Sequence, residues 1–162
     1  MSDLLMSMPL EYEPLRKNRF LLRFPSDLGI QSWWVASASR PTITMGETEI
    51  PFLNTSTWVV GRYKWEQINV TLRDPIGPSA SQAVMEWIRL ASESVTGRQG
   101  YAASYSRDMI IEMLDPTGVA VSQWILKNCI PVVGNFGELS YDSDDLATIE
   151  LTIRPQYCIL SF

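Results

Sequence analysis

The sequence predicts a mainly β fold: a small β-barrel or sandwich of two packed sheets, with one flanking α-helix and a long inter-strand arm. Short segments of alternating apolar and polar residues, broken by Pro, Gly and Asn, predict the strands. One apolar stripe at helical spacing predicts the helix, and one long segment predicts the arm. A length of 162 residues with 46% hydrophobic residues suits a domain that buries its own core. We therefore expect residues 1–162 to form a single domain.

Alternation predicts strands buried on one side at residues 18–24, 64–73 and 147–157. The inward-facing residues would be Phe20, Leu22 and Phe24, then Ile68, Val70 and Leu72, and finally Ile149, Leu151 and Ile153. Polar residues occupy most of the intervening positions, so each strand has a second face for solvent or a partner. The chain would end on the last of these strands.

A β-hairpin is predicted where residues 107–114 and 119–129 flank the sequence Asp115-Pro116-Thr117-Gly118. Pro presets the backbone for a turn, and Gly supplies the positive φ that closes it. The two flanks would then pair as neighbouring antiparallel strands.

One helix is predicted at residues 79–93. Ser79 can cap a free backbone N–H, Gln82 can reach back to the cap, and Pro78 ends the preceding segment. The apolar stripe consists of Ala83, Val84, Trp87, Ile88 and Ala91. This spacing is typical of a helix that lies on a sheet. The Ser-, Gly- and Ala-rich residues 92–106 are expected to form a mobile connection.

Two apolar segments have no evident place in such a core. Residues 41–61 are expected to reach outward as an arm rather than to form a tight hairpin. Residues 1–17 are expected to form an N-terminal arm. The apolar residues expected to contact a partner are Ile43, Met45, Ile50, Pro51, Phe52 and Leu53, together with Leu4 and Leu5. Exposed apolar segments of this kind usually mark a protein contact.

The absence of histidine excludes His-based acid–base catalysis, Ser-His-Asp triads and His-ligated metal sites. The sequence also contains no P-loop and no Gly-rich dinucleotide-binding motif. The acidic residues Asp142, Asp144 and Asp145 lack the glycine and the distant glutamate of an EF-hand, which favours a solvated loop. We therefore expect no catalytic site, no cofactor and no bound metal.

The charge of the sequence argues against tight nucleic-acid binding. The net charge is −5 and the 13 basic residues are scattered, whereas a phosphate-binding surface needs concentrated positive charge. The N-terminal residues lack the pattern of a signal peptide, and no apolar run is long enough to span a membrane. Cys129 and Cys158 are far apart in sequence and are expected to be buried free thiols.

The six tryptophans could stack on sugars, but packing in the core or at an interface is the default interpretation. Trp87 lies on the predicted helix stripe and Trp124 in a predicted strand. Trp33 and Trp34 are adjacent, so a strand there would turn them to opposite faces. One of the two is therefore expected to be exposed or at a subunit contact.

Three stretches carry a resemblance to a known family. The most specific reads Ile-Pro-Val-Val-Gly at 130–134, Gly-Glu-Leu-Ser-Tyr-Asp-Ser-Asp at 137–144 and Ile-Glu-Leu-Thr-Ile at 149–153. The others are Ile-Pro-Phe-Leu-Asn at 50–54 followed by Gly61, and residues 65–74 followed by a helix that carries Trp87. In this order, from about Asn18 to Cys158, they resemble the tail tube family of contractile-tailed phages. That family shares its fold with the tube protein of type VI secretion.

The resemblance implies a structural subunit and no enzyme. Six copies would close a ring by joining their sheets, and the rings would stack into a tube inside a contractile sheath. The arm would contact the adjacent ring, so the expected inter-ring contacts are Ile43, Met45, Ile50, Pro51, Phe52, Leu53, Leu4 and Leu5. Its partners would be other copies of itself and the tail sheath, baseplate and tail terminator proteins, with no membrane insertion. The tube would belong to the virion and assemble in the host bacterial cytoplasm. Joining strand edges would also protect edges that otherwise invite uncontrolled pairing.

Polar strand faces are the candidates for the lining of the tube lumen, which would conduct DNA without specific binding. Acidic or neutral polar side chains would repel phosphates weakly along the path. The candidates are Gln67, Asn69, Thr71, Thr148, Glu150 and Thr152. An ordinary solvent-facing role explains any one of them equally well.

Several alternative functions stay open on the sequence. The nearest is a tube-initiating baseplate protein, or the tube of a tailocin or other contractile injection system. A Trp-rich β-sandwich that binds carbohydrate would be a monomer with an exposed aromatic platform. An enzyme without His would need a pair of carboxylates in a cleft.

Overall fold

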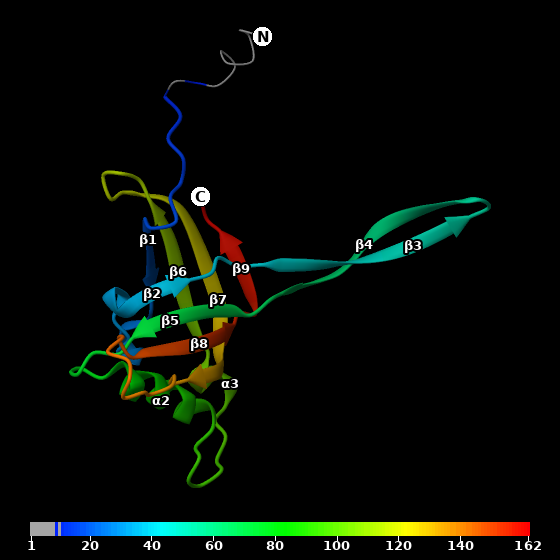
Figure 1. Cartoon of the computed structure of the whole chain (residues 1–162). Coiled ribbons are helices and arrows are strands. Elements are labelled where there is room, and N and C mark those ends of the chain that lie inside the picture. Colours follow the sequence, from blue (N-terminus) through cyan, green and yellow to red (C-terminus); the bar gives the residue numbers. More distant parts are fainter. Residues whose placement is uncertain (1–8, 10) are drawn as a thin grey trace.

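The computed structural model describes residue 9 and residues 11–162. Its elements in chain order are β1 (Phe20–Arg23), η1 (Ser26–Leu28), η2 (Ser32–Trp34), β2 (Val35–Ala38), β3 (Ile43–Phe52), β4 (Thr55–Trp65), β5 (Ile68–Arg73), α2 (Ala80–Ala91), α3 (Ala102–Tyr105), β6 (Arg107–Leu114), β7 (Ala120–Asn135), β8 (Thr148–Arg154) and β9 (Tyr157–Leu160). Figure 1 shows a body of two strand layers with α2 at one end, and an arm formed by β3 and β4 that projects far from the body. The predicted mainly β class with one flanking helix is confirmed.

The two layers of the body share one long strand. The strand order is β1-β6-β7-β8-β5-β2, and β9 also pairs with β7. The first part of β7 pairs with β6 and β9, whereas Ile130–Asn135 pairs with β8. Figure 1 shows β2, β5 and β8 running across β1, β6 and β7. The result is an open sandwich and not a closed barrel, because β1 and β2 do not pair with each other.

The strand β7 changes layer at Asn128, which has a positive φ of 51°. The pairing of β6 with β7 is irregular here, as expected of a bulge that bends a strand. The carboxylate of Asp108 accepts a hydrogen bond from the backbone N–H of Asn128 at 3.0 Å, and Lys127 Nζ lies 3.2 Å from its other oxygen. The Asn128 hydrogen bond is the main cause that lowers the pKa of Asp108. Asp108 therefore stabilises the bend at which β7 passes from one layer to the other.

The predicted inward residues of β5 and β8 form the centre of the core. Each of them is at most 1% exposed, and they form one cluster with Leu22 of β1 and Leu126 of β7. Phe24 packs against this cluster and Phe20 is half-buried. The prediction of one-sided burial in these three regions is confirmed.

Three predicted strand boundaries are wrong. The second strand of the predicted hairpin continues to Asn135 and does not end at Cys129. Residues 64–73 are not one strand, because the chain leaves the arm at Trp65 and enters the body only at Ile68. The last predicted strand ends at Arg154, since Pro155 has no N–H for the next ladder bond. The chain then turns back and adds β9 to the opposite layer, which the alternation did not predict.

The helix α2 begins as predicted. The Ser79 hydroxyl oxygen accepts a hydrogen bond from the Gln82 backbone N–H at 3.3 Å. The predicted reciprocal bond is wrong, because the Gln82 side chain donates to Glu86 at 3.2 Å. Val84 and Trp87 are buried, and the Trp87 Nε1–H donates to the carbonyl oxygen of Tyr105 at 2.7 Å. The helix ends at Ala91, two residues before the predicted end.

The connection after the helix has more structure than its composition predicted. Ser92 and Gln99 form an isolated antiparallel bridge, and residues 102–105 form the short helix α3. The segment between the two bridge residues forms the exposed loop below α2 in Figure 1. The bridge closes this loop at its base.

The predicted turn between β6 and β7 is confirmed. Asp115 Oδ1 accepts hydrogen bonds from the backbone N–H groups of Thr117 and Val119, and Gly118 has a φ of 89°. The hydroxyl of Thr117 is the main cause that lowers the pKa of Asp115, because it also donates to this carboxylate. The turn is therefore closed by its own polar residues.

The expectation for Trp33 and Trp34 is confirmed for a different reason. Trp33 is 65% exposed and Trp34 is fully buried. They lie on a 3-10 helix and not on a strand, and the two rings pack edge to face with centroids 6.0 Å apart. The short helix turns one ring into the core and leaves the other on the surface.

Candidate assembly surfaces

Five of the six candidate lumen residues lie together on one face of the body. Strands β5 and β8 pair in register, so Asn69 lies opposite Thr152 and Thr71 lies opposite Glu150. The Thr152 hydroxyl donates to Asn69 Oδ1 at 3.0 Å. Thr148 lies opposite Arg73 on the same face. Gln67 is exposed but precedes β5, so it has no partner in the ladder.

This polar face also contains residues that are not among the six candidates. Arg73 continues the alternation of Asn69 and Thr71, so its place was visible in the sequence. Ser37 of β2 and Asn135 of β7 join the face because they pair with Thr71 and Glu150, which only the strand order shows. Arg73 has the opposite charge to Glu150, and Arg154, which continues the alternation of β8, lies 3.9 Å from Glu66. The face is therefore polar and close to neutral.

The same layer has a free strand edge on each side of the polar face. β2 pairs with β5 alone, and Ile130–Asn135 of β7 pairs with β8 alone, within the residues that the structure describes. Val132 and Val133 on the β7 edge are 43% and 47% exposed. Free backbone N–H and C=O groups at such edges are ready to pair with another strand.

The arm is a long antiparallel hairpin. The prediction of an outward-reaching segment is correct, but the expectation that it would not be a tight hairpin is wrong. Its strands pair from Ile43 with Trp65 to Phe52 with Thr55, joined by the two-residue loop Leu53-Asn54. The arm therefore continues past the predicted end at Gly61.

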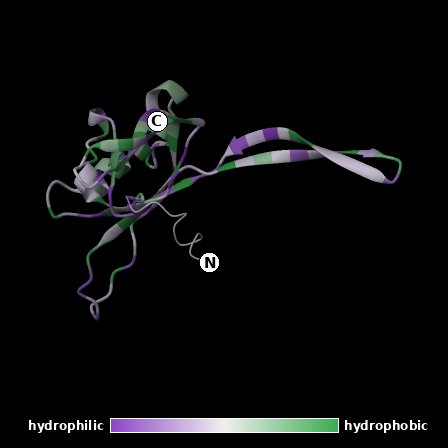
Figure 2. Ribbon diagram, turned by 90° about the horizontal axis from the view of Figure 1, so that it is seen from above, coloured by the Kyte–Doolittle hydropathy of each residue, from purple (hydrophilic) through white to green (hydrophobic). Residues whose placement is uncertain are grey.

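The arm exposes apolar side chains along its whole length. They are Ile43, Met45, Ile50, Phe52, Leu53, Trp58, Val59, Val60 and Tyr63, and each is at least 39% exposed. Figure 2 shows hydrophobic stretches that continue toward the arm's far end. All the predicted apolar arm residues thus lie on one projecting element, since Pro51 is in β3 as well. Leu4 and Leu5, the other two predicted contact residues, lie outside the described residues.

Two glycines shape the arm where its strands cross. Gly46 and Gly61 face each other at an irregular point of the ladder, and a Cβ on Gly46 would lie 3.0 Å from the carbonyl oxygen of Arg62. Glycine at both positions therefore allows the two backbones to approach closely. A bulge of this kind also increases the local twist.

The other groups considered in the sequence form no site in the described part of the chain. Asp142, Asp144 and Asp145 are exposed in the loop before β8, and no three His, Cys, Asp or Glu residues are grouped to hold a metal ion there. Cys129 and Cys158 are buried free thiols, as expected. Burial is the main cause that raises the pKa of each to about 12. Within the described residues, no helix has the length and apolar character needed to cross a membrane.

The tryptophans do not form an aromatic platform. Only Trp33 and Trp58 are mostly exposed, and they lie on η2 and on the arm respectively. Trp65 and Trp124 pack edge to face with centroids 6.2 Å apart. Their geometry thus gives no support to a flat sugar-binding face.

The chain matches a known protein family, and its fold is similar to several solved structures. The model of the family described as T4-like virus tail tube protein gp19 matches residues 16–158. No curated protein matches the chain. The fold is similar to a chain of the anti-feeding prophage tube-terminating cap, with a TM-score of 0.74, 18% identity and coverage of 95% of this chain and 94% of that one.

Two further solved structures have a similar fold. A chain of the PVC extracellular contractile injection system, in its extended sheath–tube complex, has a TM-score of 0.73, 18% identity and coverage of 94% of this chain and 93% of that one. A type six secretion system protein has a TM-score of 0.51, 9% identity and coverage of 87% and 81%. At these identities the likeness concerns the fold alone.

Proposed function

The chain belongs to the T4-like virus tail tube protein family, and from this premise we propose that its copies close into rings of six that stack into a tube. It is a structural tail tube protein of a contractile, phage-like system.

The observation that carries the proposal is the position of the two free edges. β2 and Ile130–Asn135 of β7 are opposite edges of one layer, with β5 and β8 between them. Pairing the β2 edge of one copy with the β7 edge of the next would continue the layer from copy to copy. Because the two edges differ, this contact is heterologous, and a heterologous contact forms a ring when the rotation closes.

The polar face would then line the lumen of the ring. Joining the edges continues the face around the inside of the ring, with Asn69, Thr71, Glu150 and Thr152 at its centre. The other face of this layer packs into the core, so it is not available to a lumen. A polar lining with balanced charge would let DNA slide, because it has no concentrated positive charge to bind phosphates.

Sheath, baseplate and terminator proteins are the proposed partners of the tube. Similar solved chains come from a sheath–tube complex, a sheath and tube terminator, and a baseplate. The tube would act within a virion or an injection particle after assembly in the host cytoplasm.

Electron microscopy of the purified protein at several concentrations tests the assembly. The wild-type chain is compared with a variant in which Asn-Gly replaces residues 46–62, leaving the Met45–Tyr63 pair at the end of a short hairpin. We expect rings or hollow tubes from the wild type and unstacked rings from the variant. A wild-type protein that stays monomeric at every concentration would contradict a self-assembling main tube.

Cysteine labelling tests the lumen. Thr152→Cys is placed on the polar face, while buried Cys129 and Cys158 should stay unreactive because their pKa values are raised to about 12. In assembled tubes we expect a small maleimide to react at position 152 and a maleimide coupled to a large protein to be excluded. Equal reaction with both reagents would place this face on the outside, and Val121→Cys on the exposed surface of β7 serves as the accessible control.

A further inference from the structure

A pocket of about 310 Å³ lies where the sandwich is open, between the edge strands β1 and β2. Its floor is apolar and consists of Phe20, Ile111 and Met113. The exposed cations Arg16, Lys17 and Arg40 also line it, and no carboxylate does. None of these three cations forms an ion pair with another described residue. The pocket therefore combines an apolar floor with unpaired positive charge.

The outer half of the arm has the complementary character. Residues 47–60 contain Glu47 and Glu49 and no Lys or Arg. Neither glutamate forms an ion pair with a described residue. Phe52 and Leu53 at the tip are 71% and 90% exposed. The arm thus has an apolar tip with two carboxylates between the tip and the body. This arrangement is complementary to a pocket with an apolar floor and cations around it.

The backbone of the tip gives a second, independent sign that this end is a contact. Leu53 has a φ of 52°, a conformation that glycine or asparagine adopts at much lower cost. The sequence places a large, almost fully exposed apolar residue at this position, where a turn alone would favour glycine. The cost of this backbone conformation is the same in the free and the bound chain, but only a bound tip removes the Leu53 side chain from water.

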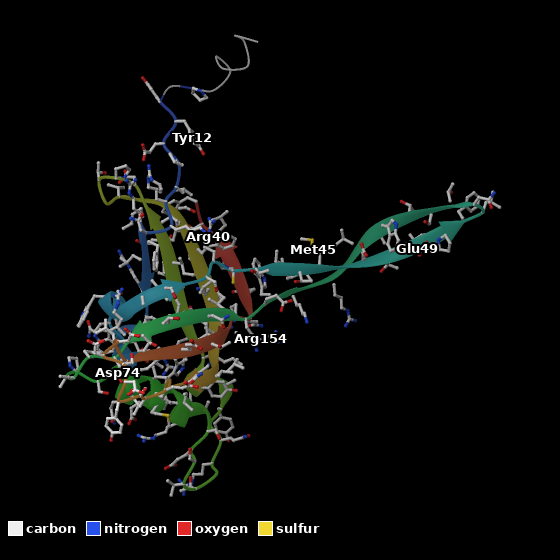
Figure 3. All side chains as sticks on the ribbon, in the orientation of Figure 1. Tyr12, Arg40, Met45, Glu49, Asp74 and Arg154 are labelled. Atoms are coloured by element: carbon white, nitrogen blue, oxygen red, sulfur yellow. The ribbon has the colours of Figure 1, made fainter. Side chains whose placement is uncertain are left out.

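The pocket and the tip of one chain cannot meet. Figure 3 shows Arg40 where the arm leaves the body and Glu49 far along the arm, which points away from the body. The two strands of the arm are paired along their length, so the arm does not fold back without breaking that pairing. The tip of one copy can therefore reach this pocket only on a second copy of the chain.

Resting on the proposed stacking of rings, we propose that the arm tip of one copy binds the pocket of a copy in the adjacent ring. Phe52 and Leu53 enter the apolar pocket, and Glu47 and Glu49 meet Arg16, Lys17 and Arg40. Because tip and pocket are different surfaces, each copy binds one neighbour with its arm and receives the arm of another. Repetition of this contact extends the stack without limit.

Charge reversal with rescue tests the electrostatic part. One variant carries Glu47→Lys and Glu49→Lys, a second carries Lys17→Glu and Arg40→Glu, and a third carries all four changes. We expect each double variant to raise the concentration needed for tube formation at least about tenfold, and the fourfold variant to restore most of the loss. Tube formation is measured by sedimentation and electron microscopy, and thermal unfolding confirms that each variant folds. A fourfold variant no better than the double variants would overturn the proposal.

Disulfide capture tests the geometry. A chain with Phe52→Cys is mixed with a differently tagged chain with Leu15→Cys, since Leu15 lines the pocket and is 52% exposed. We expect a mixed disulfide between the two chains in tubes. Val95→Cys, at a site that is 91% exposed in the loop after α2, should give little mixed product with Phe52→Cys.

The outcomes separate this contact from the proposed function. Tubes without the mixed disulfide would overturn the pocket contact and leave the tube assembly intact. Both would be overturned if the wild-type chain forms no rings or tubes and the Phe52→Cys and Leu15→Cys chains form no mixed disulfide. If deletion of residues 1–10 prevents tube formation and Glu47→Lys/Glu49→Lys does not, the N-terminal segment is the occupant and the arm proposal is wrong.

Discussion

The arm and the centre of the body are built from the same kind of strand pair. β5 and β8 pair along six residues of each strand, and β3 and β4 pair along nine. In the first pair the alternate apolar side chains are at most 1% exposed, whereas Trp58 in the second is 56% exposed. The difference is a second layer. β5 and β8 face the layer of β1, β6 and β7, whereas the arm beyond its base at Trp65 faces no other described part of its own chain.

This difference separates folding from assembly. Apolar burial in the body stabilises each copy, because the buried surface is removed from water when the chain folds. A two-stranded hairpin alone is marginally stable, so the arm gains most of its stabilisation when another molecule covers it. We therefore expect substitutions in the body to change unfolding and substitutions in the arm to change assembly.

The largest effect on folding is expected from Trp87→Ala. The Trp87 side chain is 1% exposed and its Nε1–H binds the Tyr105 carbonyl oxygen, so the change leaves a cavity and an unpaired carbonyl. We expect a loss of about 3–5 kcal/mol in the free energy of unfolding, measured with urea. Trp58→Ala on the arm is the matched control, with an expected change within about 0.5 kcal/mol. Equal losses would show that the arm contributes to the fold of its own chain.

A bulky residue at Gly46 should change the arm and leave the body unaltered. In Gly46→Val the new Cβ would meet the Arg62 carbonyl oxygen at 3.0 Å, where backbone has to move. We expect a local cost of about 1–3 kcal/mol, seen as faster hydrogen exchange of arm amides, with an unchanged melting temperature of the body. Tube formation should weaken as well. Unchanged exchange in the arm would contradict the close approach of its strands.

Substitution of Leu53 should separate the cost of the turn from the benefit of the contact. Leu53→Gly removes a side chain from a positive-φ position and should stabilise the hairpin by roughly 1 kcal/mol. It also removes the apolar tip, so tube formation should weaken while arm amides become better protected. Leu53→Asn tolerates the same backbone and should behave similarly. Stronger assembly by either variant would show that Leu53 is not a contact residue.

The smallest effect is expected at the bend of β7. The pKa of Asp108 is lowered in the folded chain, so its carboxylate adds stability above its unfolded pKa, and this stability is lost as the pH falls through the folded pKa. We expect Asp108→Asn to cost about 1 kcal/mol near neutral pH and to flatten the decrease of stability at acidic pH. Urea unfolding between about pH 6 and about pH 2 measures both. An equally steep curve in the variant would assign the acid sensitivity to other carboxylates.

Much of the body could be predicted from the sequence because its signals are local. Ile149, Leu151 and Ile153 alternate with polar residues, and the turn at Asp115 and the cap at Ser79 each depend on residues at most four positions apart. The arm was visible as a long apolar segment without a place in the core. Its hairpin form was missed because Leu53-Asn54 lacks the glycine that usually marks a two-residue turn.

Local sequence patterns did not predict the features of the surfaces that depend on distant segments. The strand β9 was missed because the short segment after Pro155 gains its strand form only by pairing with β7. Arg16 and Arg40 line one pocket although they are 24 positions apart in the sequence, since the start of β1 lies beside the end of β2. No pattern of neighbouring residues predicts that these two arginines line the same pocket.

The sequence by itself determined which residues face inward and where the helix begins, because neighbours within a few positions decide these properties. Its composition, which includes no His, excludes histidine chemistry. Tertiary structure alone decided which strand edges stay free, that Asn69 meets Thr152 across 83 residues, and that the arm points away from the basic pocket. These properties follow from the order of strands in the sheet. Strand order depends on pairing and packing between distant segments, which the alternation within any one segment does not encode.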